Sequence, residues 1–306
     1  MATLAVAAVF VGWAWINADR PEVSTDNAYV RADKTLVSPK VRGMIAEVLV
    51  AENQPVKAGD PLVRIDPAEY DARLEAAQGD LMAAEAAART ARAGLARLDA
   101  ETAAAGKTVD AAKALAGPAL ADPKIRDAFT AAQAQALVVA RSRAEFQAKL
   151  AESQAAAFRA RTALNWARLE KDETLVRAPV AGVAADIGAE PGALVQPGVR
   201  LLTIVRPATL YVTANFKETQ TTRMLPGQVA QVRVDAMPGR VFTGKVASIA
   251  PASGSEFALI PFEPGAGNFT KIVQRIPVRI ALDPGQKDLP RLRSGLSAVV
   301  TVKVAS

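Results

Sequence analysis

Candidate acid and base residues gather at one point of the chain, where Asp66, Glu69 and Asp71 lie close together. Neighbouring carboxylates can do general acid–base work. These carboxylates coincide with the start of an expected helix, where the helix dipole and solvent explain them equally well. The sequence has no His and no Cys, so neither a His-assisted triad nor a zinc site of ordinary ligands can be assembled. A serine–lysine mechanism needs neither residue type, but no motif points to one.

The glycine motifs of nucleotide-binding proteins are missing as well. No segment matches the phosphate loop G-x-x-x-x-G-K-[ST]. Gly265 and Gly267 lie close together, but the strand, third glycine and helix of a dinucleotide site do not surround them. We therefore expect no catalytic residue, no cofactor and no metal ligand. The function must lie in the architecture.

Residues 36–66 and 175–205 are two copies of one short β motif. The copies align at an offset of 139, and the matched residues include Gly43 with Gly182, Gly59 with Gly198 and Ile65 with Ile204. Each copy alternates apolar residues between glycine turns, which is typical of short strands. Neither copy alone could bury a two-sided core. We expect residues 37–66 and 175–206 to form one small sandwich.

The residues between the copies, 67–174, predict two long helices. From Pro67 the apolar period changes from two to seven, with spacings that alternate between three and four, as in a coiled-coil seam. Asp66 and Asp122 each precede a proline, and this pairing is a good helix start. Each helix of about fifty residues would be about 75 Å long. Because both copies of the β motif must meet, we expect an antiparallel hairpin with its tip near residues 115–123. Arg143 and Ser153 fall on the second seam and indicate local register drift.

The remaining residues predict a β-barrel and a membrane anchor. Residues 207–306 contain five strand-like runs between Pro-Gly breakers, and residues 24–36 are expected to join them in a small barrel. Residues 2–16 carry no charge and contain Trp13 and Trp15 near their end, which favours a single anchor within residues 1–18. Fifteen helical residues reach only about 22 Å. The net charge of +6 is scattered without interleaved aromatic residues, so no nucleic-acid partner is expected. The fold class is α+β, elongated and multidomain.

Several segments resemble the HlyD/EmrA type of membrane fusion protein, the periplasmic adaptor of drug efflux systems. The matching segments are TDNAYVRAD at 25–33, VSPKVRGMIAEVLVAENQPVKAGDPLVRIDP at 37–67, RAPVAGVAADIGAEPGALVQPG at 177–198, ANFKETQ at 214–220 and PASGSEFALIPFEPGAGNFTKIVQRIPVRI at 251–280. They cover nearly the whole chain, and the last segment is similar to the EmrA branch. The resemblance implies that the sandwich is lipoyl-like and that the chain assembles as a homo-oligomer. It also implies a Gram-negative inner-membrane location, with most of the chain in the periplasm.

The resemblance further implies a bridge between two membrane partners. One is an inner-membrane transporter of the major facilitator class, and the other is a TolC-like outer-membrane channel. Related adaptors meet the channel with the hairpin tip, which assigns that contact to Lys113, Leu115 and Asp122, although the Arg of the family pattern falls on Ala111. Asp122 is equally explained as a helix cap. The barrel candidates for transporter or subunit contacts are Asn215, Phe216, Lys217, Glu218, Phe257, Phe269 and Lys271. Barrel aromatics more often fill a core than face a partner.

Two other functions stay open at this point. A swinging-arm carrier with a lipoyl or biotinyl lysine would use a similar sandwich, but it would place its lysine in a tight turn where this chain has long helices. A lipoyl or biotinyl mass on any lysine would favour that function. A coiled-coil scaffold without transport would leave drug resistance unchanged when the gene is removed.

Overall fold

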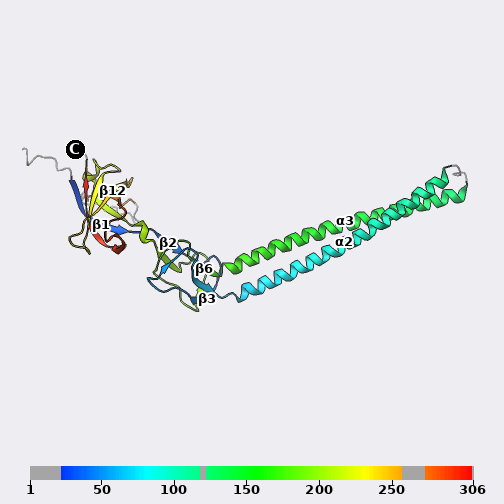
Figure 1. Ribbon diagram of the computed structural model, residues 1–306, viewed down its shortest axis with the longest axis horizontal. Helices are drawn as coiled ribbons and strands as arrows, with labels where there is room; N and C mark the ends of the chain where they lie inside the picture. The colour runs from blue at the N-terminus through cyan, green and yellow to red at the C-terminus, as the bar shows by residue number, and fades with distance from the viewer. Residues whose placement is uncertain (1–21, 118–121, 257–272, 305–306) are drawn as a thin grey trace, which may run out of the picture.

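A computed structural model of the chain describes residues 22–117, 122–256 and 273–304. The molecule is elongated, with a barrel at one end, a two-sheet body in the middle and a pair of long helices at the other end (Figure 1). The chain passes from the barrel into the body and the helices, and then returns through the body to the barrel. The anchor predicted within residues 1–18 lies outside the described residues. Among the described helices, none is long and apolar enough to cross a membrane.

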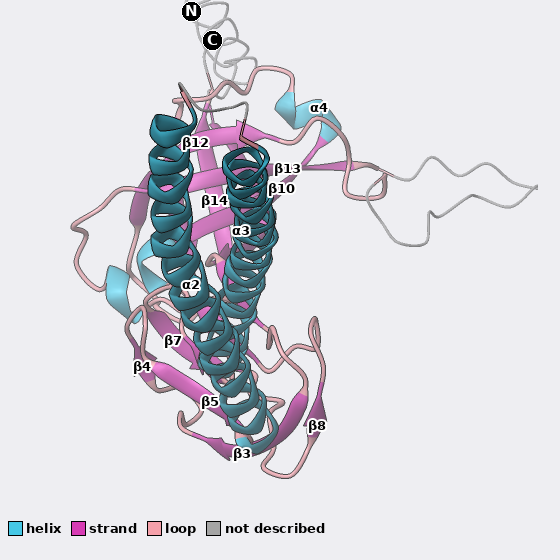
Figure 2. Cartoon of the chain, turned by 90° about the vertical axis from the view of Figure 1, so that its right-hand side faces the viewer, coloured by secondary structure: helices cyan, strands magenta, loops and turns pink. Residues whose placement is uncertain are grey.

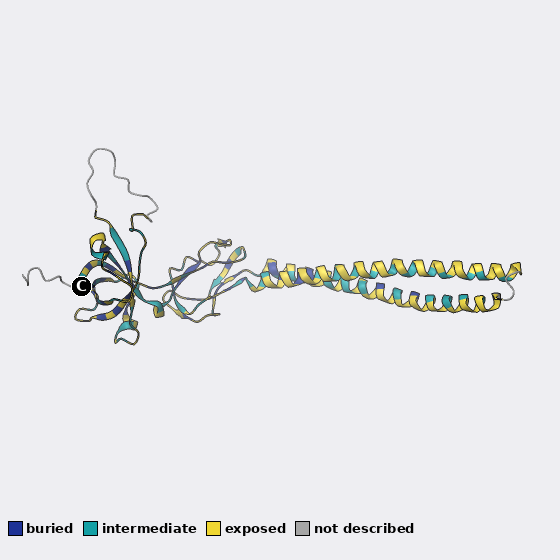
Figure 3. Cartoon of the chain, turned by 90° about the horizontal axis from the view of Figure 1, so that it is seen from above, coloured by how far each residue is buried: buried dark blue, intermediate teal, exposed yellow. Residues whose placement is uncertain are grey.

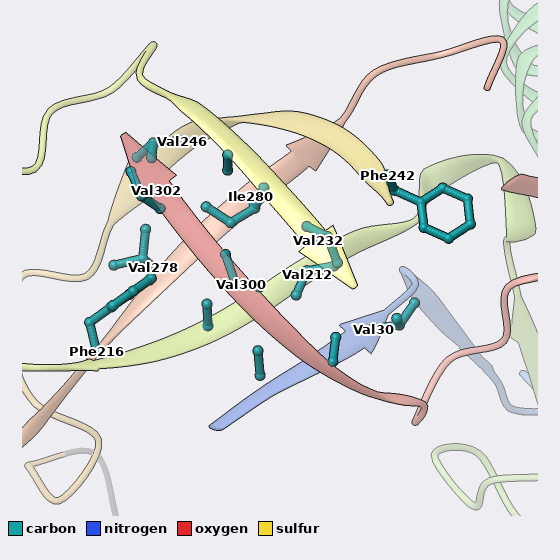
Figure 4. Close-up of a cluster of buried hydrophobic side chains, with 14 of the residues drawn as sticks. Val30, Val212, Phe216, Val232, Phe242, Val246, Val278, Ile280, Val300 and Val302 are labelled. Atoms are coloured by element: carbon teal, nitrogen blue, oxygen red, sulfur yellow. The ribbon is translucent and has the colours of Figure 1, made fainter. Parts of the chain in front are cut away.

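Six antiparallel strands close the barrel in the order β1-β10-β13-β12-β11-β14. The strands are β1 (Glu22–Arg31), β10 (Tyr211–Lys217), β11 (Val229–Val234), β12 (Phe242–Ile249), β13 (Arg275–Leu282) and β14 (Ser297–Lys303). The short helices in the connections are η1 (Pro207–Thr209), α4 (Glu218–Thr221) and η2 (Leu289–Arg291). Alternate residues of each strand face inward because side chains in a strand alternate between its two faces. They form a core of mostly β-branched residues, with Phe216 and Phe242 at opposite ends of the cluster (Figure 4).

The middle body consists of two four-stranded sheets, ordered β2-β9-β7-β4 and β6-β5-β3-β8. Their strands are β2 (Lys34–Val37), β3 (Gly43–Val48), β4 (Pro55–Val56), β5 (Pro61–Ile65), β6 (Leu175–Arg177), β7 (Gly182–Ala185), β8 (Leu194–Val195) and β9 (Leu202–Val205). Each sheet takes two strands from each copy of the repeat. The copies are therefore intertwined. At the offset of 139 residues, β3 corresponds to β7 and β4 corresponds to β8, and each such pair is divided between the two sheets. The prediction that both copies form one sandwich is confirmed by this pairing.

Matched glycines allow the close packing inside this body. A Cβ atom on Gly182 would lie 2.5 Å from the carbonyl oxygen of Val205 and 2.6 Å from Cγ2 of Ile204. A Cβ atom on Gly43, its counterpart in the first copy, would lie 2.5 Å from Cγ2 of Ile65. Both positions therefore need a residue without a side chain, which explains why the two copies match at glycine here.

The two expected long helices are present as α2 (Ala68–Ala116) and α3 (Pro123–Asp172), and they run antiparallel side by side (Figures 1 and 2). Tyr70, Ala77, Ala91 and Leu98 of the predicted seam are buried. The outer surfaces of both helices are exposed along their length (Figure 3). Since alanine is the commonest seam residue, many turns bury little apolar area.

Ion pairs join the two helices along the seam edges. Lys171 Nζ lies 2.6 Å from Asp71 Oδ1, and Arg143 Nε lies 2.5 Å from Asp99 Oδ1. The sequence interpretation of Arg143 as mere register drift missed this contact. Ser153 donates a hydrogen bond to the carbonyl oxygen of Lys149, one turn earlier in its own helix. Exposed pairs of this kind contribute little to stability.

The boundary between barrel and sandwich falls earlier than predicted. Lys34–Val37 was expected to belong largely to the barrel, but it forms β2 and pairs with β9 of the sandwich. The reason is the anchoring of Asp33 at the crossing point. Its backbone N–H donates to Thr209 Oγ1 at 3.1 Å, and its carboxylate accepts from Arg206 at 3.1 Å and lies 3.7 Å from Arg279. These contacts tie the outgoing strand to the returning one, so the chain leaves the barrel at Asp33.

Candidate functional site

The tip of the helix pair carries the residues predicted to meet an outer-membrane channel. Lys113 and Leu115 lie in the last turn of α2, and both are exposed. Leu115 is 71% exposed. The Lys113 carbonyl accepts a 3.2 Å hydrogen bond from the backbone N–H of Gly117, which closes the helix end. The structure therefore presents the Lys113 and Leu115 side chains to solvent at the end of α2.

Asp122 has a defined local role on the other side of the tip. Its Oδ1 atom accepts a 2.9 Å hydrogen bond from the backbone N–H of Lys124, and Pro123 occupies the first turn of α3. This is the helix cap predicted from the sequence. Asp122 is also exposed, and its hydrogen bond to Lys124 uses only the Oδ1 atom. The Asp122 carboxylate can therefore cap α3 and still contact a partner protein.

The barrel candidates separate into surface and core. Lys217 and Glu218 are exposed where β10 meets α4. Phe216 is fully buried in the barrel core, so its prediction as a contact residue is wrong (Figure 4). Strand alternation accounts for this, because Phe216 shares the inward face with Val212 and Ala214.

Asn215 is held by its neighbours rather than free for a partner. Its side-chain Nδ2 donates to Asn27 Oδ1 at 2.9 Å. Its backbone carbonyl accepts from Thr25 Oγ1 at 2.9 Å and from Arg275 at 3.1 Å. The register of β1 shifts between Thr25 and Ala28, which turns these polar side chains toward β10. This cluster was not predicted from the sequence, although polar residues inside a strand-like run were a signal. Phe257, Phe269 and Lys271, the remaining candidates, lie outside the described residues.

The neighbouring carboxylates Asp66, Glu69 and Asp71 belong to the base of the helices. Asp66 accepts a 3.0 Å hydrogen bond from the backbone N–H of Ala68, and Glu69 pairs with Arg73 one turn later. The hydrogen bond and negative charge of Asp71 raise the pKa of Lys171 above its ordinary value. These contacts account for the carboxylates as helix-end and interhelix partners. Across the three described ranges, no group of three or more acidic, His or Cys residues is arranged to hold a metal ion.

Family models match most of this architecture. The model described as "RND MFP, barrel-sandwich hybrid domain" matches residues 33–206, which is more than half of the chain. The model described as "CusB-like, beta-barrel domain" matches residues 209–256. The first match contains the sandwich and the helix pair, and the second begins just before β10 of the barrel.

Several curated relatives are similar over nearly the whole chain. The colistin resistance protein EmrA of Acinetobacter baumannii is 36% identical over 91% of this chain and 86% of its own length. The multidrug export protein EmrA of Escherichia coli is 31% identical over 98% of this chain and 81% of its own. The fatty acid resistance protein FarA of Neisseria gonorrhoeae is 34% identical over 92% and 76% of the two chains.

Solved structures share the fold. MacA from Actinobacillus actinomycetemcomitans superposes with a TM-score of 0.61, covering 94% of this chain and 81% of its own, at 18% identity. The membrane fusion protein Spr0693 from Streptococcus pneumoniae gives a TM-score of 0.59, covering 93% and 99%, also at 18% identity. Together with the family models and the relatives above 30% identity, this common architecture shows that the chain belongs to the HlyD/EmrA-type membrane fusion proteins.

Proposed function

We propose that the chain is the periplasmic adaptor of an efflux system, which links an inner-membrane exporter to a TolC-like outer-membrane channel. The observation that carries this function is the long helix pair, which projects from one end of the sandwich while the barrel occupies the other (Figure 1). Helices of 49 and 50 residues span about 75 Å and carry no chemistry, so they serve to set a distance. The names of the relatives, colistin resistance, multidrug export and fatty acid resistance, support efflux as the process.

The orientation follows from the path of the chain. β1 begins at Glu22 at the barrel end remote from the sandwich, and the uncharged residues 2–16 precede it in the sequence. In the proposal these residues anchor the adaptor in the inner membrane of a Gram-negative bacterium, the barrel lies next to the membrane, and the hairpin points across the periplasm. The exporter is of the major facilitator class. Several copies of the chain surround the conduit, because one narrow hairpin encloses no channel.

The proposed division into domains follows the same path. Residues 1–18 form the anchor, residues 22–33 and 207–306 the barrel, and residues 34–66 and 175–206 the lipoyl-like domain. Residues 67–174 form the coiled-coil hairpin. The connection between β5 and β6 is this hairpin, whereas a swinging-arm carrier needs a tight turn there to present its lysine. The position of the hairpin therefore favours the adaptor over the carrier.

The proposed contacts lie at the two ends of the molecule. Lys113, Leu115 and the free oxygen of Asp122 meet the outer-membrane channel. Lys217 and Glu218 meet the exporter or a neighbouring subunit, and Asn215 positions the strand from which they project. The exposure of these residues supports their roles, since a contact residue must be accessible before assembly.

The test uses cysteine crosslinking in membranes. Because the chain has no native Cys, only the introduced cysteine of this chain can form a crosslink. Leu115→Cys at the tip is expected to capture the outer-membrane channel, and Lys217→Cys at the barrel is expected to capture the exporter. Leu137→Cys, on an exposed part of α3 away from both ends, serves as the control and should capture neither. If neither end variant captures its partner, or if deletion of the gene leaves drug resistance unchanged, the adaptor function is wrong.

A further inference from the structure

The turn between α4 and β11 exposes apolar side chains at the end of the barrel that lies away from the sandwich. Leu225 is 61% exposed and Val229 is 46% exposed. The strand pairing places this turn at the end where β1 begins, because Val302 pairs both with Val23 of β1 and with Ala230 of β11. A single exposed apolar residue needs no explanation, but neighbouring ones at one end of a domain mark a contact surface.

Hydrogen bonds hold this turn in one conformation. The backbone N–H of Leu225 donates to Gln228 Oε1 at 3.0 Å, and Gln228 Nε2 donates to the carbonyl oxygen of Arg223 at 3.0 Å. The backbone N–H of Gly227 donates to the carbonyl oxygen of Val246 on β12 at 2.8 Å. Gly227 has a φ of 92°, and a proline followed by such a glycine is typical of a type II turn. Because the turn is already ordered, it loses little conformational entropy when it docks on a partner.

Lysines flank the apolar residues on the neighbouring strands. Val229 pairs with Lys245 on β12, and Lys303 lies at the same level on β14, the other neighbour of β11. Both lysines are exposed. Glu22 lies opposite Lys303 on β1, so this level of the barrel wall carries two cations and one acid. Lysine stems can lie along an apolar layer while their ammonium groups reach phosphates, so an apolar tip between lysines fits an anionic lipid surface.

The outer wall of the barrel along β11 becomes less polar toward this end. The outward-facing residues of β11 are Arg233, Gln231 and Val229, in order from the sandwich side to the remote end. Leu225 in the turn continues this order beyond the strand. The apolar contact therefore lies at the end of the barrel and not along its side.

The length of chain before β1 brings this end of the barrel to the membrane. In the proposed function residues 2–16 anchor the chain, and residues 17–21 separate them from Glu22. Such a segment spans roughly 20 Å when it is fully extended. Val229 lies two strands away from Glu22, which is about 10 Å at the ordinary spacing of strands. Since headgroups extend roughly 5 to 7 Å beyond the hydrocarbon core, the turn is within reach of them.

The exporter is the other candidate partner for this turn. The exporter or subunit contact proposed above lies at Lys217 and Glu218, where β10 ends. In the closed order of strands, β11 lies three strands from β10 in either direction, on the opposite side of the barrel. A barrel that meets the exporter at the end of β10 therefore leaves the end of β11 to the bilayer.

We infer that the turn Leu225–Gln228, together with Val229, Lys245 and Lys303, docks on an anionic lipid surface. The inference rests on the anchor and the orientation of the proposed function, and it adds a second contact between the chain and the membrane. A single tether leaves the tilt of the barrel free, whereas a tether and a docked turn together fix it. The direction of the hairpin is then set by the lipid contact at the other end of the molecule.

Quenching of a fluorescent dye by spin-labelled lipids tests the contact on the full chain. The dye is attached at Leu225→Cys, or at Val241→Cys as the matched control, in a chain that has no native Cys. Val241 is 51% exposed and directly precedes β12, at the sandwich end of the same barrel. The chain is reconstituted without exporter in vesicles that contain phosphatidylglycerol. Spin labels near the headgroups are expected to remove most of the emission at position 225 and to leave the emission at position 241 unchanged.

Each other result overturns the inference. If the dye at position 225 stays unquenched without exporter, the turn does not dock on lipid, and a change in its emission only when exporter is added identifies the exporter as its partner. If both positions are quenched equally, no particular end of the barrel docks. Flotation with the vesicles and drug resistance of the cells keep the two proposals apart. Chains that float but stay unquenched at position 225 refute the lipid contact alone. Docking by a chain whose gene can be deleted without loss of resistance refutes the adaptor function alone.

A charge removal tests whether anionic lipid is the partner. With the dye at position 225, Lys245→Gln is expected to lower the ratio of docked to undocked turns, read from the quenched fraction, by roughly fivefold, as the loss of one cation near an anionic surface does. Lys287→Gln removes the same charge from an exposed lysine between β13 and β14, at the sandwich end, and should leave the ratio unchanged. In vesicles of phosphatidylcholine alone the two variants should behave alike. If Lys245→Gln docks as well as Lys287→Gln on phosphatidylglycerol vesicles, anionic lipid is not recognised and the inference is wrong.

Discussion

At Asp122, substitutions can distinguish the helix-capping role of the side chain from its proposed contact with a partner. Its side chain accepts the 2.9 Å hydrogen bond from the Lys124 amide, whereas its backbone carbonyl accepts from Arg126 at 3.1 Å whatever the side chain is. Asp122→Ala therefore removes one capping bond and nothing else from the helix. The expected cost is about 1 kcal/mol. At room temperature that corresponds to an approximately fivefold rise in the local opening of the first turn of α3.

Amide hydrogen exchange at Lys124 and the following residues measures this opening, and Asp122→Asn is the matched control. Asparagine caps as well as aspartate but carries no charge. We expect Asp122→Asn to keep slow exchange, and we expect Asp122→Ala to exchange about fivefold faster. Equal exchange in both variants would refute the capping argument. Resistance lost in Asp122→Asn despite slow exchange would show that the carboxylate charge itself meets the partner.

Three further predictions concern the base, the tip and the pH dependence of the hairpin. Gly182→Ala should lower the unfolding free energy by about 1–3 kcal/mol, because the new Cβ meets a backbone oxygen, whereas Gly188→Ala, whose Cβ would have no neighbour closer than 3.9 Å, should change it little in urea unfolding. Leu115→Ala should change the free energy of unfolding by no more than about 0.5 kcal/mol but reduce resistance, since only an exposed side chain is lost. Because Asp71 raises the pKa of Lys171, their attraction is present at neutral pH and is lost as the pH rises above the ordinary lysine value through the raised one. The unfolding free energies of wild type and Lys171→Met, followed by circular dichroism, should therefore become equal only at strongly alkaline pH.

The larger elements of the fold could be predicted because each has a local signal. The heptad spacing and the Asp-Pro starts predicted helices that the structure places within about two residues of the expected ends. The repeat predicted one sandwich. The exchange of strands between its two sheets could not be predicted, because two similar copies give no information on which strand pairs with which.

The candidate contacts were less predictable because they depend on which way a side chain points. Phe216 was placed at the surface by resemblance, but strand alternation puts it in the core. The transfer of Lys34–Val37 to the sandwich depends on the contacts of Asp33 with residues more than 170 positions away. The tip residues were located correctly on the two helix ends, since capping is decided by neighbours in sequence.

The insertion of the hairpin between β5 and β6 has a consequence for the order of folding. These two strands pair directly, although more than 100 residues separate Ile65 from Leu175. A flexible loop of that length would slow the pairing of β5 with β6, because the entropy cost of bringing distant segments together precedes any stabilising contact between them. If contacts between the antiparallel helices form first at the tip and then toward the base, they bring β6 close to β5 without a long search. A mutation that loosens the helix pair should therefore slow the formation of a sheet that it never touches.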